Sequence, residues 1–202
     1  MHRDEQKSLE NHWELLDSQT VYEHPVLRVR KDHYRLHPEE REGDFIALEM
    51  RDWVNIIPIT PEREIVLVRQ FRHGTRQVSL ETPGGVMDPG ETPEMAAMRE
   101  LREETGYVAK SVRLLASIYP NPAIQQNRGY FVLAEYCRKL EATQFDPWED
   151  IECVRMTHDQ LREAIRTGML NHGLPLLGLA YYDAACPGRC TDGRGLLSPK
   201  TN

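Results

Sequence analysis

The segment from residue 84 to residue 107 reads GGVMDPGETPEMAAMRELREETGY. Within it, Thr92 is a good helix N-cap residue, and Pro93 suits a first helical turn. Gly106 stands where a helix commonly ends in a left-handed residue. This spacing predicts a helix over residues 93–105. We expect its apolar side to consist of three large side chains, Met95, Met98 and Leu101.

Three carboxylates fall in the second half of this expected helix, those of Glu100, Glu103 and Glu104. Residues three and four apart share a helix face, so these groups repel one another, and the helix dipole also disfavours anions there. Arg99 reaches Glu103 at a spacing of four and Arg102 lies beside it, yet two arginines do not obviously neutralise Glu100 and Glu104. A hard divalent cation with oxygen ligands would neutralise them. The alternative is an ordinary solvated helix face rich in charge.

The residues before the helix favour the metal interpretation. Gly84 and Gly85 allow backbone conformations and close approaches that a side chain forbids. A backbone carbonyl of this loop would complete the coordination of a cation held by the helix. Because Mg²⁺ binds few protein carboxylates and keeps other positions for water or substrate phosphates, we expect a phosphorylated substrate.

Strand-like runs lie on both sides of the expected helix. Alternating or continuous apolar character predicts strands within residues 27–29, 46–50, 53–59, 65–71, 112–118, 130–136 and 151–156. A second helix is expected after the cap residue Thr157, ending near Gly168, and a third over residues 174–184. The order of these elements predicts an α+β fold with a mixed sheet between helices and an N-terminal antiparallel β extension.

Length and composition limit the classes of protein. The 202 residues suit one domain with a short extra element, and 40% apolar residues are enough for a core. A formal net charge of −7 argues against binding nucleic acid through a broad basic surface. No run is apolar and long enough to cross a bilayer, and the polar first ten residues do not resemble a targeting signal. We expect a cytoplasmic protein without nucleic-acid or membrane partners, and its four dispersed cysteines favour reduced thiols.

The spacing within residues 85–107 is that of a known motif. Its fixed positions are Gly85, Glu91, Arg99, Glu100, Leu101, Glu103, Glu104 and Gly106. This pattern resembles the box of the Nudix hydrolase family. The family usually ends the box with a bulky aliphatic residue, whereas this chain has Tyr107, a position that holds no expected metal ligand. The resemblance implies an α/β/α sandwich that uses Mg²⁺ or Mn²⁺ to hydrolyse a nucleoside diphosphate linked to another group.

The resemblance also assigns roles to the residues of the box. The expected metal ligands are the side chains of Glu100, Glu103 and Glu104 and the carbonyl of Gly84. The expected structural residues are Gly85, Glu91, Arg99 and Gly106. Among these, the arginine and the first glutamate hold the loop and the helix together. Glu103 is also a candidate catalytic residue.

Two further stretches are similar to the branch of the family that hydrolyses ADP-ribose and other nucleoside diphosphate sugars. They are VRQFRHG at residues 68–74 and ETPGG at residues 81–85. In that branch a proline lies about sixteen residues past the box, and Pro122 stands sixteen residues past Gly106. The expected substrate-binding residues are Arg69, Arg72, Glu81 and Pro122. Arginine forks suit phosphate oxygens, and the alternative for each charged residue here is an ordinary surface or strand-end charge.

The expected reaction is attack of an activated water on one phosphorus of a pyrophosphate, which needs a general base within hydrogen-bond reach. In the similar branch, a glutamate on a late loop often has this role, and the acidic segment 146–152 matches that loop. The predicted base is Glu149, followed by Asp150. The alternative is an ordinary acidic turn before a strand.

The sequence and the resemblance together divide the chain into three parts. Residues 1–50 are a polar start and a β extension through which relatives dimerise, residues 51–185 are the catalytic domain, and residues 186–202 are a flexible tail. We expect a homodimer, since twofold dimers are the commonest oligomers. The alternative functions are hydrolysis of a nucleoside triphosphate, a dinucleoside polyphosphate or a coenzyme A derivative, and ligand sensing without hydrolysis.

Overall fold

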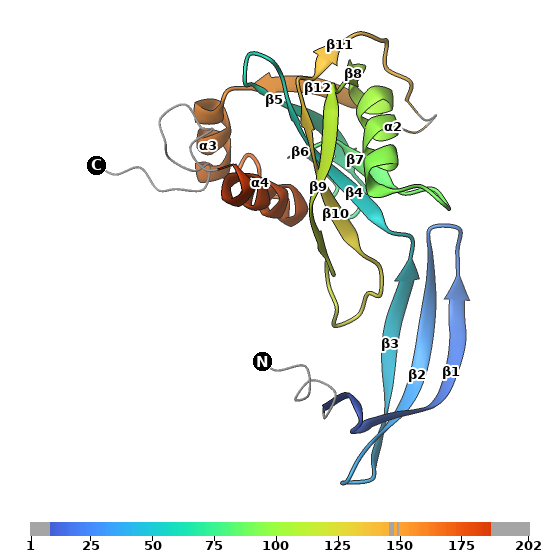
Figure 1. Ribbon diagram of the computed structural model, residues 1–202. Coiled ribbons are helices and arrows are strands. Elements are labelled where there is room, and N and C mark those ends of the chain that lie inside the picture. The colour runs from blue at the N-terminus through green and yellow to red at the C-terminus, as the bar shows by residue number, and fades with distance from the viewer. Residues whose placement is uncertain (1–8, 146–147, 149, 187–202) are drawn as a thin grey trace. The chain divides into compact units, whose positions relative to one another are not determined.

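The computed structural model describes residues 9–145, 148 and 150–186. The chain forms two compact units (Figure 1). The first combines Met1–Arg51 with Tyr119–Arg128, and the second combines Asp52–Ile118 with Gly129–Asn202. The whole of the segment with the three glutamates therefore lies in the second unit.

The first unit is an antiparallel sheet in the order β1-β2-β3 (Figure 1). Its strands are β1 (Trp13–Glu23), β2 (Leu27–Leu36) and β3 (Arg41–Met50). A bridge between Leu48 and Gln125 joins β3 to the segment Tyr119–Arg128. The sequence predicts two short strands here, and the structure adds β1, whose eleven residues are all exposed. A strand exposed on both faces lacks the alternation that marks a half-buried one, so its pattern is weak.

The second unit is built on a mixed sheet with the strand order β12-β5-β4-β10-β9. In this sheet β6 also pairs with β5, and β7 with β4. The bounds are β4 (Trp53–Ile59), β5 (Ile65–Arg72), β6 (Gln77–Glu81), β7 (Gly84–Val86), β9 (Ser111–Ile118), β10 (Gly129–Glu135) and β12 (Ile151–Met156). Strands β4 and β10 run parallel, and the other pairs are antiparallel. A separate ribbon pairs β8 (Tyr107–Val108) with β11 (Arg138–Lys139).

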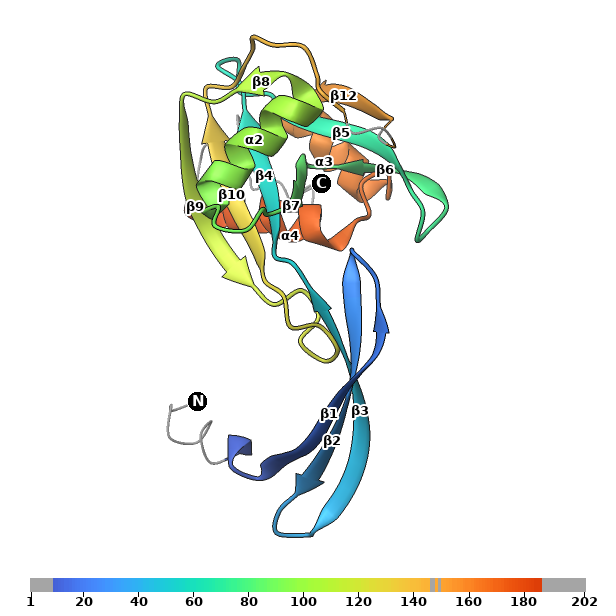
Figure 2. The ribbon, with the colours of Figure 1, turned by 90° about the vertical axis from the view of Figure 1, so that its right-hand side faces the viewer.

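Helices cover both faces of this sheet (Figures 1 and 2). One face carries α2 (Pro93–Thr105), and the other carries α3 (His158–Arg166) and α4 (Gly173–Ala185). Because side chains alternate along a strand, β4 gives Ile56 to the core beneath α2 and Ile57 to the core beneath α3 and α4. The predicted α+β fold with a mixed sheet between helices is confirmed. Over the described residues, no helix is both long and apolar enough to cross a membrane.

The ends of α2 are those that the sequence predicts. The Thr92 side chain accepts a hydrogen bond from the Met95 amide at 3.3 Å and so caps the first turn. Gly106 adopts a φ of 71° and donates from its amide to the Arg102 carbonyl at 2.8 Å. A Cβ on Gly106 would meet the carbonyl oxygen of Glu141. Glycine is required there by space as well as by backbone conformation.

The predicted apolar stripe of α2 is wrong in two of its three members. Met95 is 51% exposed and Met98 is 47% exposed, whereas Leu101 is buried as expected. Ala96 and Ala97 are fully buried in place of the methionines. Two small side chains let the helix backbone lie close to the strands, because the distance between packed elements depends on the side chains at the contact.

The helix expected after Thr157 is also present. Thr157 and Gln160 form a capping box, in which each side chain accepts a hydrogen bond from the other's amide, at 3.3 and 2.9 Å. The helix ends at Arg166, shortly before Gly168, which has a φ of 76°. Of the predicted tail, residues 186–202, all but Cys186 lie outside the described residues.

Candidate active site

Arg99 connects the loop before α2 to the helix itself. Its Nε and Nη2 donate to the two carboxylate oxygens of Glu91, both at 2.9 Å. Its Nη1 donates to Glu100 at 2.8 Å and to Glu103 at 3.2 Å, and Nη2 also donates to the Val86 carbonyl at 3.2 Å. The expectation that Arg99 leaves Glu100 without a cationic partner is therefore wrong, because one guanidinium contacts three carboxylates.

Arg99 and Glu91 are both ionised throughout the neutral pH range. The hydrogen bond from Arg99 is the largest influence on the pKa of Glu91, and with the Asp88 amide it lowers that pKa to about 2. The same contact with Glu91 raises the pKa of Arg99, against the opposing effect of burial. A bidentate pair of this kind is short and directional, which suits a group that fixes a loop against a helix.

Glu104 is a buried carboxylate that faces the backbone of β7. It is only 4% exposed, and its Oε2 accepts a hydrogen bond from the Gly84 amide at 3.0 Å. Gly84 itself lies against β4, where a Cβ would collide with the carbonyl oxygen of Val54 and lie 3.0 Å from the Asn55 Cα. The two strands approach closely because position 84 has no side chain.

Gly85 lies directly against the carboxylate of Glu100. A Cβ at this position would be 2.6 Å from the Glu100 Cδ and 2.7 Å from its Oε2. Position 85 is therefore a cradle that any side chain would fill. Because the neighbouring atoms are the end of the flexible Glu100 side chain, a larger residue at position 85 would displace this carboxylate rather than the backbone.

These residues fit a hard divalent cation by the chemistry of their donors. The helix presents the carboxylates of Glu100, Glu103 and Glu104 beside the loop that carries the Gly84 carbonyl, and all four groups offer oxygen. In the part of the chain that the structure describes, no three acidic, histidine or cysteine side chains converge as a ready-made metal cluster. The contacts of these carboxylates include those of Glu100 and Glu103 with Arg99 and that of Glu104 with the Gly84 amide.

A second cluster of charged groups joins the ends of β5 and β6 to the start of α4. Glu81 is 2% exposed, and Arg72 binds it with both arms: Nε lies 2.8 Å from Oε1, and Nη2 lies 2.6 Å from Oε2. The Nδ1 atom of His172 lies 3.1 Å from the same Oε2. Burial, the largest influence, opposes ionisation of Glu81, but the two hydrogen bonds from Arg72 and the nearby His172 ring outweigh it and lower the pKa of Glu81 to about 2.

Strand register places the side chains of Glu81 and Arg72 on the same face of the sheet as α2. Glu81 is the partner of Val68 in the pairing of β6 with β5, and Val66, two residues earlier, packs in the core beneath α2. Arg69 belongs to the opposite face, where it donates to Glu152 of β12 at 2.9 Å. The structure therefore brings Arg72 and Glu81 together, whereas Arg69 lies on the opposite face of the sheet beside Glu152.

The remaining predicted residues lie outside these two clusters. Pro122 belongs to the first unit, in the segment Tyr119–Arg128. Asp150 is exposed directly before β12, and Glu149 lies outside the described residues. Sequence reasoning missed His172, because a single histidine before an expected helix belongs to no recognisable motif.

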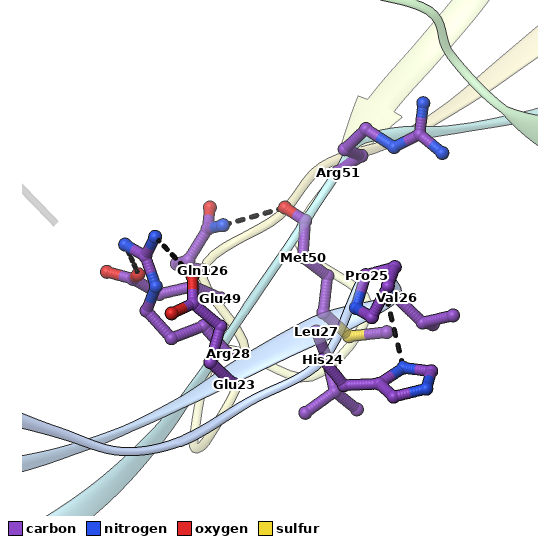
Figure 3. A pocket seen from close by; sticks show the side chains of 10 residues that line it. All are labelled: Glu23, His24, Pro25, Val26, Leu27, Arg28, Glu49, Met50, Arg51 and Gln126. Atoms are coloured by element: carbon purple, nitrogen blue, oxygen red, sulfur yellow. Dashed lines mark hydrogen bonds and ion pairs between the residues drawn. The ribbon is translucent and has the colours of Figure 1, made fainter.

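The first unit has a cavity of its own, about 550 Å³ in volume, where the turn between β1 and β2 meets the end of β3 (Figure 3). Its lining residues are Glu23, His24, Pro25, Val26, Leu27, Arg28, Glu49, Met50, Arg51 and Gln126. Arg28 donates to Glu23 at 3.1 Å and to Glu49 at 3.2 Å, and the Gln126 side chain donates to the Met50 carbonyl at 2.8 Å. These contacts link the three strands at one end of the sheet and join β3 to the segment Tyr119–Arg128.

A family model described as NUDIX domain matches residues 50–172, which is more than half of the chain. The chain belongs to the NUDIX family. The family predicted from the box is thus confirmed, and Nudix hydrolases generally use divalent metal ions.

Three relatives show where this Nudix chain is similar to named proteins. An ADP-ribose pyrophosphatase of Bacillus subtilis (strain 168) is 35% identical over 105 residues, which cover 52% of this chain and 57% of that protein. A methanol dehydrogenase activator of Bacillus methanolicus is 30% identical over 129 residues, or 63% of this chain and 70% of that protein. A GDP-mannose pyrophosphatase of Enterobacter sp. (strain 638) is 31% identical over 128 residues, which cover 59% of this chain and 66% of that protein.

The fold of the Nudix chain is also that of a solved structure. The crystal structure of ADP compounds hydrolase superimposes with a TM-score of 0.77 at 21% sequence identity, covering 88% of this chain and 95% of that one. This likeness extends over both units and shows the fold. The chain spans little more than half of the length of the Bacillus subtilis relative.

Proposed function

We propose that this Nudix protein is a pyrophosphohydrolase that requires Mg²⁺ or Mn²⁺ and cleaves ADP-ribose or another nucleoside diphosphate sugar. The products would be a nucleoside monophosphate and a sugar phosphate. The observation that carries the proposal is the buried Glu104 against the Gly84 amide, beside the carboxylates that Arg99 holds. The names of two relatives, an ADP-ribose pyrophosphatase and a GDP-mannose pyrophosphatase, support the substrate class.

The residues that would hold the cation are those of the box. We assign this role to the carboxylates of Glu100, Glu103 and Glu104 and to the carbonyl of Gly84, because a hard cation prefers such oxygen ligands. When bound, the cation would acidify a water molecule and neutralise phosphate oxygens. Arg99 orients two of the carboxylates through its Nη1 atom, and Glu91 anchors Arg99 in turn.

The substrate would be held by the arginine that Glu81 fixes. The Arg72 side chain is 44% exposed and is suited to pairing with phosphate oxygens. Arg69 and Pro122 remain predicted substrate contacts. The general base is proposed to be Glu149 or, failing that, Asp150, which stands exposed before β12.

The first test is hydrolysis of a panel of compounds with and without MgCl₂. The panel contains ADP-ribose, GDP-mannose, UDP-glucose, NADH, a nucleoside triphosphate, a dinucleoside polyphosphate and coenzyme A. We expect turnover of a nucleoside diphosphate sugar that EDTA abolishes, and ¹⁸O water would identify the phosphorus attacked. Preference for one of the last three compounds would replace the substrate proposal, and turnover of none would favour a sensor without hydrolytic activity.

The second test is the variant Glu104→Gln. Its amide oxygen still accepts the hydrogen bond from the Gly84 amide, so we expect a nearly unchanged melting temperature. The loss of one negative charge should reduce kcat at least about a hundredfold, as expected for a metal ligand. Glu94→Gln, in the first turn of the same helix, is the control and should keep full activity. Full activity in Glu104→Gln would refute the metal assignment.

We also propose that two copies associate through the first unit, and that the protein works in the cytoplasm. Every residue of β1 is exposed, and Trp13, Tyr34 and Phe45 form an aromatic cluster with ring centroids 5.7 to 6.3 Å apart. Trp13 is 48% exposed and Phe45 46% exposed. Large exposed apolar patches of this kind mark interaction sites. A second copy of the same sheet is the occupant that we expect.

A further inference from the structure

His172 occupies the N-cap position of α4 but does not cap the helix. Its side chain makes no hydrogen bond to the first turn, whereas the cap residues Thr92 and Thr157 of α2 and α3 both do. The imidazole instead reaches β6, where Nδ1 lies 3.1 Å from the Oε2 atom of Glu81. The residue that begins α4 is thus directed at a carboxylate on a distant strand.

Glu81 is the centre of this contact, because both of its oxygens have partners. The Arg72 guanidinium engages Oε1 at 2.8 Å and Oε2 at 2.6 Å, so His172 and Arg72 share Oε2. The carboxylate is 2% exposed, whereas the side chains of Arg72 and His172 are 44% and 36% exposed. Glu81 therefore lies beneath two cationic or polar groups that reach the surface.

The backbone of Arg72 is also fixed. Its carbonyl accepts hydrogen bonds from the Arg76 amide at 2.7 Å and from the Thr75 hydroxyl at 3.4 Å, within the turn between β5 and β6. With the strand end held, the direction of the guanidinium depends on the plane of the Glu81 carboxylate. That plane is set by the groups around the two oxygens: Arg72 donates to both, and the His172 ring lies against Oε2.

We propose that His172 is a positioning residue that holds the Glu81 carboxylate in the plane that presents Arg72 to the phosphate groups of the substrate. This inference rests on the proposed function, since it takes the substrate to be a nucleoside diphosphate derivative. His172 acts through Glu81 and does not itself need to touch substrate. The ionised state of Glu81, whose pKa is about 2, keeps this arrangement the same throughout the neutral range.

The chain offers a matched set of variants for this proposal. His172→Leu keeps much of the volume of the side chain but removes the contact with Glu81. His172→Asn restores a nitrogen donor close to where Nδ1 lies. His73→Leu is the control, because His73 is exposed in the adjacent turn, where its ring packs against Phe71 with centroids 5.3 Å apart.

The measurements are the KM and kcat for ADP-ribose or GDP-mannose with MgCl₂, together with the melting temperature of each variant. We expect His172→Leu to raise KM about tenfold with kcat changed less than about threefold. The reason is that the charged hydrogen bond from Arg72 to a substrate phosphate would be weakened equally in the bound substrate and in the transition state. His172→Asn should return KM to within about threefold of the wild type. A lower melting temperature with unchanged KM in His172→Leu, or no recovery in His172→Asn, would overturn the proposal.

A double-mutant cycle with Arg72→Lys tests the route of the effect. Lysine cannot make the two-armed contact with Glu81, so the influence of His172 should be largely lost in that background. We expect His172→Leu to add less than about twofold to the KM of Arg72→Lys. A full tenfold addition would show that His172 acts independently of Arg72 and would contradict the proposal.

Binding measured without turnover separates this inference from the proposed function. Calorimetry with ADP-ribose and with GDP-mannose in EDTA gives Kd values for the same variants, and the order should match that of KM. If the wild type hydrolyses neither compound yet binds one of them with the expected order of variants, the proposed reaction fails and the role of His172 stands. Equal Kd values for wild type and His172→Leu would refute that role, and absence of both binding and hydrolysis in the wild type would contradict both proposals.

Discussion

Gly85 is the residue at which the loop and the carboxylates of α2 come closest together. Its missing Cβ leaves space for the Glu100 carboxylate, whose Cδ would otherwise be 2.6 Å away. The neighbour is the end of a flexible side chain, so Gly85→Ala should lower stability by no more than about 1 kcal/mol. Displacement of Glu100 should nevertheless reduce kcat at least about tenfold. Melting curves and Mg²⁺-dependent kinetics check both effects.

Gly74→Ala is the control for this substitution, because a Cβ at Gly74 meets nothing within 4 Å. It should leave both stability and kcat close to those of the wild type. If Gly85→Ala retained full activity, the contact between position 85 and Glu100 would have no part in the reaction.

His158 makes stability depend on pH in a direction that follows from its surroundings. It is 2% exposed beneath Tyr182, and burial, followed by the charges of Arg63 and Arg162, lowers its pKa from the usual 6.5. Below pH 6.5 the unfolded chain therefore takes up a proton at this histidine that the folded chain does not. The contribution of His158 to stability is present above pH 6.5 and falls as the pH decreases from there towards the folded pKa.

The variant His158→Phe keeps an aromatic ring at this site and removes the titration. We expect the fall in melting temperature between pH 7.5 and pH 5.5 to be smaller in the variant than in the wild type. His12→Phe, at an exposed position of the first unit, should leave the wild-type fall unchanged. The same pH dependence in His158→Phe and wild type would show that the buried histidine does not titrate as described.

The elements that the sequence predicts best are those with local signals at both ends. Thr92 and Gly106 mark α2, and the capping box at Thr157 marks α3, because N-caps and left-handed ends depend on residues within one turn. Burial within α2 was harder to predict. Which of two faces meets the sheet depends on how closely the helix and strands pack, and here the small side chains of Ala96 and Ala97 face the sheet.

Gly106 and Gly168 allow two causes of glycine preference to be separated. Both have positive φ, at 71° and 76°, but a Cβ meets the Glu141 carbonyl oxygen at the first and nothing within 4 Å at the second. Gly168→Ala should cost about 1 kcal/mol, the usual penalty of a left-handed backbone. Gly106→Ala should cost clearly more, about 2–4 kcal/mol, because the collision is with backbone. Denaturant melts measure both, and equal costs would contradict the steric argument.

The candidate site combines a part that the sequence predicts with one that it does not. The pairing of Arg99 with Glu91 lies within a single motif, so spacing alone indicates it. The cluster of Arg72, Glu81 and His172 joins the ends of two strands to a later helix. No local pattern encodes such a contact, because it arises from the register of β5 with β6 and from the place where α4 begins.

At the scale of the whole molecule, the main part that the sequence does not predict is the length of the first unit. The strands β2 and β3 pair over ten residues each, and β1 adds a third strand with no buried residue. Alternation cannot reveal a strand that has neither face covered within the chain. The exposed aromatic cluster of Trp13, Tyr34 and Phe45 is the feature that the proposed second copy would cover.

The proposed homodimer gives a prediction for the intact 23.4 kDa chain. Sedimentation velocity and light scattering should report twice this mass at micromolar concentration. The double variant Trp13→Ser with Phe45→Ser removes two of the three clustered rings, and aromatic residues of this kind dominate interfaces, so it should shift the equilibrium to monomer. Leu140→Ser, at a side chain that is 68% exposed in the second unit, should leave the dimer intact. A wild type that stays monomeric, or a double variant that remains dimeric, would mean that this aromatic face does not join two copies.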